Sequence, residues 1–326
     1  MRTQLTKSEM LGNRREMLAA GALSATAVVA GVSSPQSALA EDSAATRQRA
    51  KPRYCLNTST IRGQKLSIVE EIDLAAKVGY DGIEPWIREI TEYTDGGGSL
   101  KDLAKRIADA GLHVESAIGF AAWIVDDQAK REAALESAKR DMELVRQLGG
   151  TRIAAPPVGA TNEKVDLSAA AERYAILVEV GREVGVTPML ELWGFSQTLH
   201  RIGEVAFVAV ESGQPDAAML LDVYHIYKGG SDFHGLKMLN GASIAAFHFN
   251  DYPADPPRDK IGDADRVYCG DGVAPLTQIL RDIYASGFHG ALSLELFNRE
   301  YWQQDAETVT RTGLQKMQQA VEQAFS

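Results

Sequence analysis

Four short apolar runs in the second half of the chain each end on a side chain that can bind a metal ion. The four terminal residues are Glu191, Asp222, His248 and Glu295. Short apolar runs bounded by turn signals are typical of buried parallel strands. The carboxyl ends of such strands meet at one end of a barrel, which is where barrels of this kind keep their chemistry. Three carboxylates and one imidazole suit a divalent ion such as Mn²⁺, Mg²⁺, Co²⁺ or Zn²⁺, so the spacing predicts one metal site formed by all four residues.

The intervals between these residues match the size of strand–helix units. Glu191 and Asp222 are 31 residues apart and Asp222 and His248 are 26 apart, which is one unit each. The step from His248 to Glu295 is longer because residues 250–274 insert a segment rich in Asp, Pro, Gly and Arg. A long irregular loop at this end of a barrel is more often a substrate-binding loop or lid than an insertion without a function.

A structural role remains the alternative for each acid taken alone. A carboxylate at a strand end is usually paired with an arginine, because burying it without a partner costs several kcal/mol. Three convergent carboxylates, however, repel one another, and they need a cation at their centre. The complete set therefore favours the metal site.

Further polar and aromatic residues follow predicted strands at the same end. His225 could hydrogen-bond a substrate oxygen or move protons, although a loop histidine bonded to backbone would look the same. In the long loop, Arg258 is the first choice and Arg266 the second for holding a substrate oxygen, and an exposed charge is the alternative. Glu84 could reach substrate and Trp193 could form an apolar wall for a sugar ring, with packing or a structural salt bridge as an equal alternative.

Strand and helix signals alternate throughout residues 52–326, and eight strand–helix pairs can be counted. The strands before the four runs are predicted at 53–59, 82–85, 112–118 and 151–155. The helices are predicted at 67–78, 100–110, 128–148, 167–184, 199–212, 233–240, 275–286 and 305–324. This alternation predicts a parallel sheet, and eight units favour closure over an open sheet. We therefore expect an α/β protein with a single (β/α)₈ barrel as its catalytic domain.

The first 40 residues read as an export signal that precedes the barrel. Arg14 and Arg15 are followed by a stretch rich in Ala, Gly and Val, and residues 38–40 read Ala-Leu-Ala, a small-x-small cleavage site. We predict a cleavable twin-arginine signal peptide over residues 1–40, a flexible lead-in over 41–51, and a periplasmic location. An uncleaved anchor or a disordered leader is the alternative, but the apolar stretch is too short and too poor in Leu, Ile and Phe for a stable membrane span.

Net charge indicates which class of partner the protein binds, and cysteine content indicates whether disulfide bonds are expected. The formal net charge of −10 argues against nucleic acid, which would need a basic face, and leaves a small molecule as the expected partner. The sequence leaves the oligomeric state open, a homo-oligomer included. Cys55 and Cys269 are expected to stay unpaired, with a single bridge as the alternative, because a chain of this size needs no disulfide framework.

At these residues the chain resembles the xylose isomerase-like TIM-barrel superfamily, which includes the AP endonuclease family 2-like barrels, in its sugar phosphate isomerase/epimerase branch. The resemblance covers residues 52–324. It is most specific in the segments 190–193 (Leu-Glu-Leu-Trp), 221–225 (Leu-Asp-Val-Tyr-His), 248–251 (His-Phe-Asn-Asp), 265–272 (Asp-Arg-Val-Tyr-Cys-Gly-Asp-Gly) and 293–295 (Ser-Leu-Glu).

The resemblance implies roles for the site residues. In ketose 3-epimerases of this superfamily a Glu, Asp, His, Glu set binds one divalent ion, which carries over to the four strand-end residues. The two glutamates also exchange the substrate proton, which would be Glu191 and Glu295 here. A histidine three residues after the Asp, here His225, and a loop arginine contact substrate. The epimerases place that arginine closer in sequence to the metal histidine than Arg258 lies to His248. This chain also lacks the histidines that form the metal cluster of the endonuclease IV branch.

These observations predict a metal-dependent isomerase or epimerase. It would act on a keto-sugar or polyol through a cis-enediolate, with two glutamates as acid and base. The alternative is a dehydratase or lyase acting on an inosose or a 3-keto-glycoside with the same metal site. A non-catalytic sugar-binding barrel would not need all four ligands. Export favours non-phosphorylated sugars or glycosides as substrates.

Overall fold

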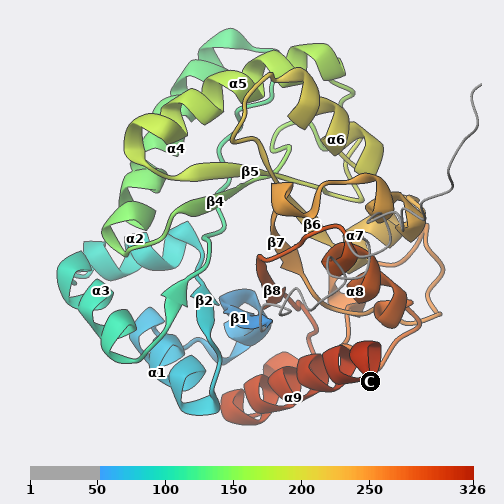
Figure 1. The fold of residues 1–326 in the computed structure, drawn as a ribbon. Coiled ribbons are helices and arrows are strands. Elements are labelled where there is room, and N and C mark those ends of the chain that lie inside the picture. Colours follow the sequence, from blue (N-terminus) through green and yellow to red (C-terminus); the bar gives the residue numbers. More distant parts are fainter. Residues whose placement is uncertain (1–51) are drawn as a thin grey trace, which may run out of the picture. The chain divides into compact units, whose positions relative to one another are not determined.

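The computed structural model describes residues 52–326 (Figure 1). The predicted signal peptide and lead-in lie outside the described residues. Within the described part, eight parallel strands form one sheet in the order β3-β2-β1-β8-β7-β6-β5-β4. The strands are β1 (Arg53–Asn57), β2 (Gly82–Glu84), β3 (His113–Val114), β4 (Arg152–Ala155), β5 (Thr187–Glu191), β6 (Ala218–Asp222), β7 (Ile244–His248) and β8 (Ala291–Leu294).

The sheet closes between β3 and β4 through a single residue beyond the end of β3. The backbone N–H of Ala117 donates to the carbonyl of Arg152 at 3.2 Å, and its carbonyl accepts from the N–H of Ala154 at 2.8 Å. The next residue, Ile118, turns back to β2 and bonds the carbonyl of Pro85 at 3.0 Å. This switch of partners explains why β3 is shorter than the predicted strand 112–118. The predicted single TIM barrel is confirmed.

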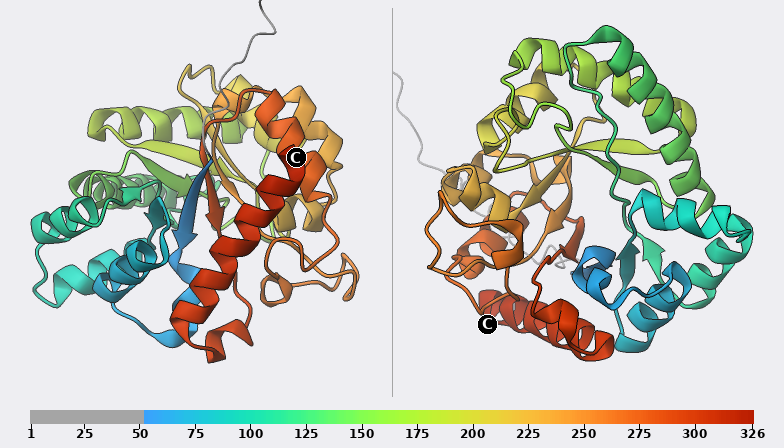
Figure 2. Two further views of the ribbon diagram at one scale, coloured as in Figure 1. Left: turned by 60° about the horizontal axis from the view of Figure 1, so that its bottom comes forward. Right: turned by 180° about the vertical axis from the view of Figure 1, so that it is seen from behind.

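Helices surround the strands, as Figure 1 and Figure 2 show. The α-helices are α1 (Ile68–Val78), α2 (Ile87–Asp95), α3 (Leu100–Asp109), α4 (Gln128–Gln147), α5 (Leu167–Val184), α6 (Ile202–Glu211), α7 (Val223–Lys228), α8 (Leu276–Ala285) and α9 (Ala306–Phe325). Helix α9 packs against both α8 and α1, which completes the ring of helices. The predicted helix 233–240 is a 3₁₀ helix, Phe233–Met238, and α2 and α7 were not predicted.

Two apolar layers hold the barrel. The larger layer lies between strands and helices and includes fully buried Leu56, Ile83 and Leu292. A smaller cluster is formed by Ile118, Ala154, Met189, Ala218, Leu220 and Ala246. Three of these six are alanines, and they come from β4, β6 and β7, whose ends carry or flank the polar residues described below. Burial of each large aliphatic side chain stabilises the fold by about 1.5–3 kcal/mol.

No helix within residues 52–326 is long and apolar enough to cross a membrane. Cys55 and Cys269 are both buried and unpaired, as predicted.

Candidate active site

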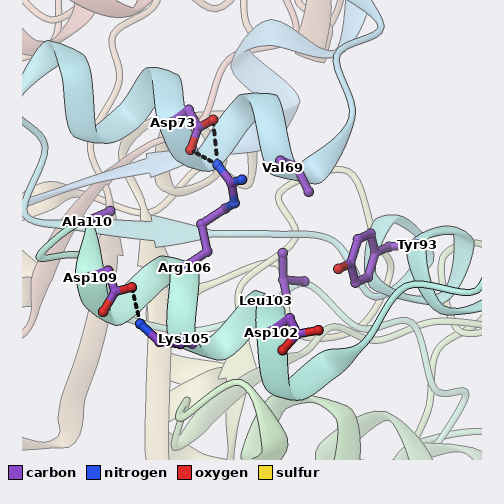
Figure 3. A pocket seen from close by; sticks show the side chains of 9 residues that line it. All are labelled: Val69, Asp73, Tyr93, Asp102, Leu103, Lys105, Arg106, Asp109 and Ala110. Carbon is purple, nitrogen blue, oxygen red and sulfur yellow. Dashed lines mark hydrogen bonds and ion pairs between the residues drawn. The ribbon is translucent and has the colours of Figure 1, made fainter.

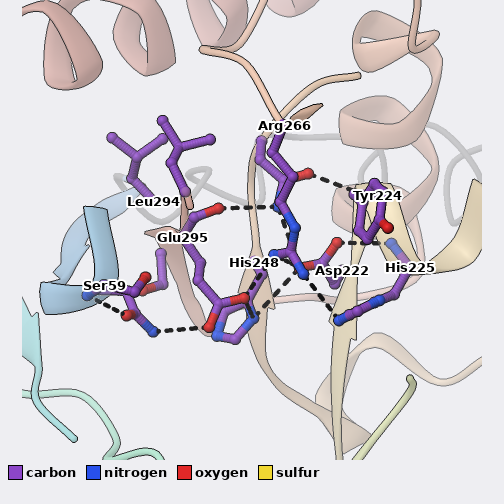
Figure 4. A network of polar contacts seen from close by, with 12 residues as sticks. Ser59, Asp222, Tyr224, His225, His248, Arg266, Leu294 and Glu295 are labelled. Atoms are coloured by element: carbon purple, nitrogen blue, oxygen red, sulfur yellow. Dashed lines mark hydrogen bonds and ion pairs between the residues drawn. The ribbon is translucent and has the colours of Figure 1, made fainter. Parts of the chain in front are cut away.

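Three of the predicted ligands converge at the carboxyl ends of adjacent strands. Asp222 ends β6, His248 ends β7, and Glu295 directly follows β8 (Figure 4). The Nδ1 atom of His248 lies 3.1 Å from Oε2 of Glu295 and 3.5 Å from Oδ2 of Asp222. All three side chains are buried, and their ligand atoms lie within 4.8 Å of one another. This triad could hold a metal ion.

Electrostatics at the triad favour a bound cation. Burial alone would lower the pKa of His248, but Glu295 and Glu84 raise it well above its usual value. Its Nδ1 atom is buried and makes no hydrogen bond, although two carboxylates face it. A positive charge is therefore attracted to this point, and a metal ion there would take the place of the ring proton.

Glu84 at the end of β2 holds His248 instead of lining the pocket. Its Oε2 atom lies 3.1 Å from Nε2 of His248 and accepts hydrogen bonds from Ser293 Oγ at 2.6 Å and Asn57 Nδ2 at 2.8 Å. The hydroxyl of Ser116 donates to Oε1. Glu84 is buried and does not belong to the pocket lining, so its contact with substrate stays a prediction. The bond from Nε2–H fixes the ring so that Nδ1 faces the other two ligands.

Replacing Glu84 by glutamine is expected to lower the affinity for Mn²⁺ by about 10–100-fold, because an amide cannot accept from all four donors and His248 loses its orientation. Isothermal titration of the purified protein measures this. Glu92→Gln, an exposed change on α2, is the matched control and should leave the affinity unchanged. A folded Glu84→Gln protein with the affinity of the parent would contradict the orienting role.

Glu191, the fourth predicted ligand, lies at the end of β5 but outside the cluster of three. It is 3 % exposed, and its Oε2 atom has no hydrogen-bond partner. Burial, together with the charge of Glu295, raises the pKa of Glu191 to about 8. Repulsion between the carboxylates of Glu191 and Glu295 is a physical reason why Glu191 lies apart from the triad. Glu191 still lines the pocket beside the triad.

Arg266 is the loop arginine that reaches the triad. Its Nη1 atom donates to Oδ2 of Asp222 at 3.0 Å and to Oε2 of Glu295 at 2.7 Å. Its Nη2 atom donates to Asp263 Oδ1 at 2.7 Å, and the side chain is 1 % exposed. Arg258, the first choice from sequence, is instead exposed and stacks 4.6 Å from the ring of Tyr227. Arg266 directly follows the short 3₁₀ helix Asp263–Asp265, and the signal that could have ranked it above Arg258 is its place in segment 265–272, where the family resemblance is specific.

Two residues that sequence reasoning did not single out anchor the long loop. The buried carboxylate of Asp251 accepts backbone N–H bonds from four loop residues, Tyr252, Gly270, Gly272 and Ala274, at 2.8–3.2 Å. The Nζ atom of Lys228 donates to the carbonyls of Arg258, Asp259 and Ile261.

Gly272 must be glycine because an added Cβ would lie 2.2 Å from the carbonyl oxygen of Tyr252 and 2.3 Å from Oδ1 of Asp251. The base of the loop is thus fixed, which holds Arg266 in place.

His225 lies in α7, and Asp222 is the N-cap residue of this helix. The carboxylate of Asp222 caps this helix by accepting the backbone N–H of His225 at 2.9 Å. The ring lies between two donors, Gly194 N–H at 3.3 Å from Nδ1 and Arg266 Nη2 at 3.0 Å from Nε2. Burial and the charge of Arg266 lower the pKa of His225 to about 4. It therefore lines the pocket as a neutral ring, in which one nitrogen carries the proton and the other accepts. The shorter contact, from Arg266 Nη2, makes Nε2 the acceptor.

The pocket beside the triad has a volume of about 210 Å³ and two different sides. The polar side is formed by Glu191, His225, Asp263, Arg266 and Glu295. The aromatic side is formed by Trp86, Phe120, Trp193, Phe195 and Phe297. The structure thus places Trp193 in the pocket wall, where the sequence predicted an apolar surface.

A larger hollow of about 540 Å³ lies on the outer face of α1 and α3 (Figure 3). Four of its charged side chains form two ion pairs, Arg106 with Asp73 at 2.5 Å and Lys105 with Asp109 at 2.5 Å. It contains none of the strand-end residues. The smaller pocket, with its buried carboxylates and perturbed pKa values, is the candidate active site.

Known proteins resemble this chain along most of its length. Inosose isomerase of Bacillus velezensis is 28 % identical over 84 % of the chain and 98 % of its own length. The 3-dehydroshikimate dehydratase of Pseudomonas aeruginosa is 26 % identical over 71 % of the chain but only 36 % of its own length. These relatives identify the chain as an enzyme of the isomerase, epimerase or lyase kind.

Solved structures show the same fold. An IolI protein with a bound zinc atom matches with a TM-score of 0.78 at 24 % identity, covering 84 % of this chain and 99 % of that one. An L-ribulose 3-epimerase matches with a TM-score of 0.67 at 21 % identity, covering 84 % and 96 %. The family description "Xylose isomerase-like TIM barrel" matches residues 72–320, which confirms the resemblance predicted from sequence. The chain belongs to the family of xylose isomerase-like TIM barrels.

Proposed function

We propose that this protein is a divalent-metal-dependent isomerase or epimerase that acts on an uncharged keto-sugar or keto-polyol. The observation that carries the proposal is the buried triad of Asp222, His248 and Glu295, with Glu191 lining the same pocket. The names of the relatives, an inosose isomerase and an L-ribulose 3-epimerase, support this reaction class.

The donor set fits one divalent ion. Two carboxylates and an imidazole suit Mn²⁺, Co²⁺ or Zn²⁺, and Mg²⁺ to a lesser degree. The unpartnered Nδ1 of His248 and Oε2 of Glu191 are buried polar atoms that such an ion would satisfy. When bound, a divalent ion polarises a substrate carbonyl and acidifies the neighbouring C–H.

Glu191 and Glu295 have opposite protonation preferences, as an acid–base pair requires. Burial would raise the pKa of Glu295, but His248 and Arg266 hold it at about 2, so this carboxylate is ionised and can take a proton. Glu191, with its pKa raised to about 8, can return one. The two glutamates come from β5 and β8, with two strands between them, so they approach the substrate from different directions. Removal of the proton by one and its return by the other gives isomerisation or epimerisation through an enediolate.

A lyase reaction is the second candidate. The relationship to 3-dehydroshikimate dehydratases favours it, because the same enediolate can expel a β-oxygen substituent. NMR of keto-sugars, inososes and 3-keto-glycosides in D₂O with added Mn²⁺ tests both reactions. Deuterium at one carbon indicates isomerisation or epimerisation, whereas loss of a substituent indicates the lyase. Purified protein without bound metal and without a gain in thermal stability on adding Mn²⁺ or Co²⁺ would contradict the proposal.

Binding of the metal is expected to lower the pKa of Glu191, so that part of the bound protein releases the proton of this carboxyl group and part keeps it for transfer to substrate. Its raised pKa means that the metal-free protein holds this proton up to about pH 8. The contribution of Glu191 to the rise of the apparent Mn²⁺ affinity with pH should therefore level off above about pH 8, and displacement of the His248 ring proton adds a separate contribution. Calorimetry in buffers of different ionisation enthalpy counts the released protons. In Glu191→Gln the contribution of this group should vanish, and an unchanged proton count would contradict the assignment.

The proposed location is the periplasm, reached by the twin-arginine route. This part of the proposal rests only on residues 1–40 of the sequence. Cell fractionation of the full chain tests it, with retention in the cytoplasm as the contrary outcome.

A further inference from the structure

We propose that the pocket carries a second binding subsite, formed by Phe120 and Phe195 at its mouth, for an uncharged ring attached to the sugar. The inference rests on the proposed function and narrows its substrate class. The substrate would be a glycoside whose aglycone is a ring, rather than a free monosaccharide or a sugar phosphate.

Five aromatic side chains form a continuous arc along one side of the pocket. The ring centroids of Trp86 and Phe120 are 5.0 Å apart, and those of Trp86 and Phe297 are 6.1 Å apart. The arc continues from Phe120 to Trp193 at 6.1 Å and from Trp193 to Phe195 at 5.1 Å. These residues follow β2, β3, β5 and β8, so barrel closure brings them together. Their faces can cover the apolar C–H face of a ring while its hydroxyls turn to the polar side.

The outer part of the arc is exposed to a degree that a lone sugar does not explain. Phe120 is 43 % exposed and Phe195 is 38 % exposed, whereas Trp86, Trp193 and Phe297 are half-buried. The pocket volume of about 210 Å³ is below the roughly 300–1,000 Å³ of pockets for drug-sized ligands. The interior therefore suits one sugar ring, and the two exposed phenylalanines lie where an attached group would rest. Both rings contact Trp193 and so extend the apolar pocket wall outward, and a contiguous apolar surface beside a pocket marks a binding site.

The charges of the pocket lining disfavour an anionic group, and Arg62 and Arg88, which stack on Trp86 at 3.8 and 5.3 Å, do not belong to that lining. Arg266 is the single lysine or arginine among the lining residues, and it already bonds Asp222, Glu295 and Asp263. No cationic side chain of the lining is left for a phosphate or carboxylate. The neighbouring acids Glu191, Asp263 and Glu295 would repel such a group.

The test compares two probes on the Mn²⁺-loaded full chain, methyl β-D-glucopyranoside and phenyl β-D-glucopyranoside. Binding is followed by the fluorescence of Trp86 and Trp193, which line the pocket. The phenyl glucoside should bind about 10-fold more tightly, the effect of one buried aromatic contact. The double variant Phe120→Ala, Phe195→Ala should lose this preference and bind the two glucosides equally tightly. Glucose 6-phosphate should not compete.

Phe207→Ala is the matched control, because Phe207 lies on α6, is 39 % exposed and does not line the pocket. This variant should keep the phenyl preference. A phenyl glucoside that binds no more tightly than the methyl glucoside, including the case in which neither binds, overturns the subsite. A preference that survives the double variant overturns it as well. Mn²⁺ binding, measured separately, shows whether the proposed metal centre fails with the subsite or stands without it.

Discussion

Glu295→Gln is expected to reduce turnover by about 10²–10⁴-fold, the usual contribution of a positioned acid or base. Glutamine keeps the shape of the side chain but cannot accept a proton from substrate. It also removes one of the two carboxylates that face Nδ1 of His248, and it removes the negative charge that pairs with Arg266 at 2.7 Å. The affinity for Mn²⁺ should fall in parallel. Deuterium incorporation in D₂O measures the turnover, and isothermal titration measures the metal.

Glu300→Gln is the control for this change, since Glu300 is exposed and lies on the same segment after β8. Glu300→Gln should leave both the turnover and the affinity for Mn²⁺ unchanged. A Glu295→Gln protein that exchanges deuterium at the parental rate would refute the acid–base role. Loss of metal binding with full activity in excess Mn²⁺ would restrict Glu295 to the role of a ligand.

Arg266→Met is expected to destabilise the metal-free protein by about 3–5 kcal/mol, the cost of breaking a buried ion pair. The change leaves Asp222 and Glu295 buried without their guanidinium partner. In the parent, burial opposes ionisation of Glu295, but His248 and Arg266 hold its pKa at about 2. A depressed carboxyl pKa contributes stability above its unfolded value, and this stability is lost as the pH falls toward 2. The difference between variant and parent should therefore be full at neutral pH and shrink below about pH 4.

Arg258→Met is the matched control because Arg258 belongs to the same loop and is exposed. Its effect on the free energy of unfolding should stay below about 0.5 kcal/mol. Urea denaturation with and without Mn²⁺ measures both variants. Saturating Mn²⁺ should restore much of the lost stability of Arg266→Met, because a divalent ion replaces the missing positive charge. Equal stabilities for the two variants would contradict the electrostatic role of Arg266.

The strand and helix pattern of the barrel could be predicted because it is local. Apolar runs and helix stops such as the glycine after α1 act over a few residues, and β4 to β8 lie where they were expected. The boundary of β3 could not be predicted, because Ala117 and Ile118 bond strands on opposite sides. Because the two residues bond different neighbouring strands, the sequence shows no alternating pattern of apolar residues that would mark the end of β3.

Of the candidate site, the sequence determined the ligand types and their common end of the barrel. Strand length and unit size place Asp222, His248 and Glu295 at one end of the barrel, where their ligand atoms converge, but the same spacing also predicted Glu191, which lies outside their cluster. Only the tertiary structure decided that Glu84 orients His248 across 164 residues of chain and that Arg266, not Arg258, reaches the carboxylates. The physical reason is that a side chain's direction and its charge partners depend on which segments barrel closure brings together, and residues far apart in the chain carry no record of that contact in their own neighbourhood.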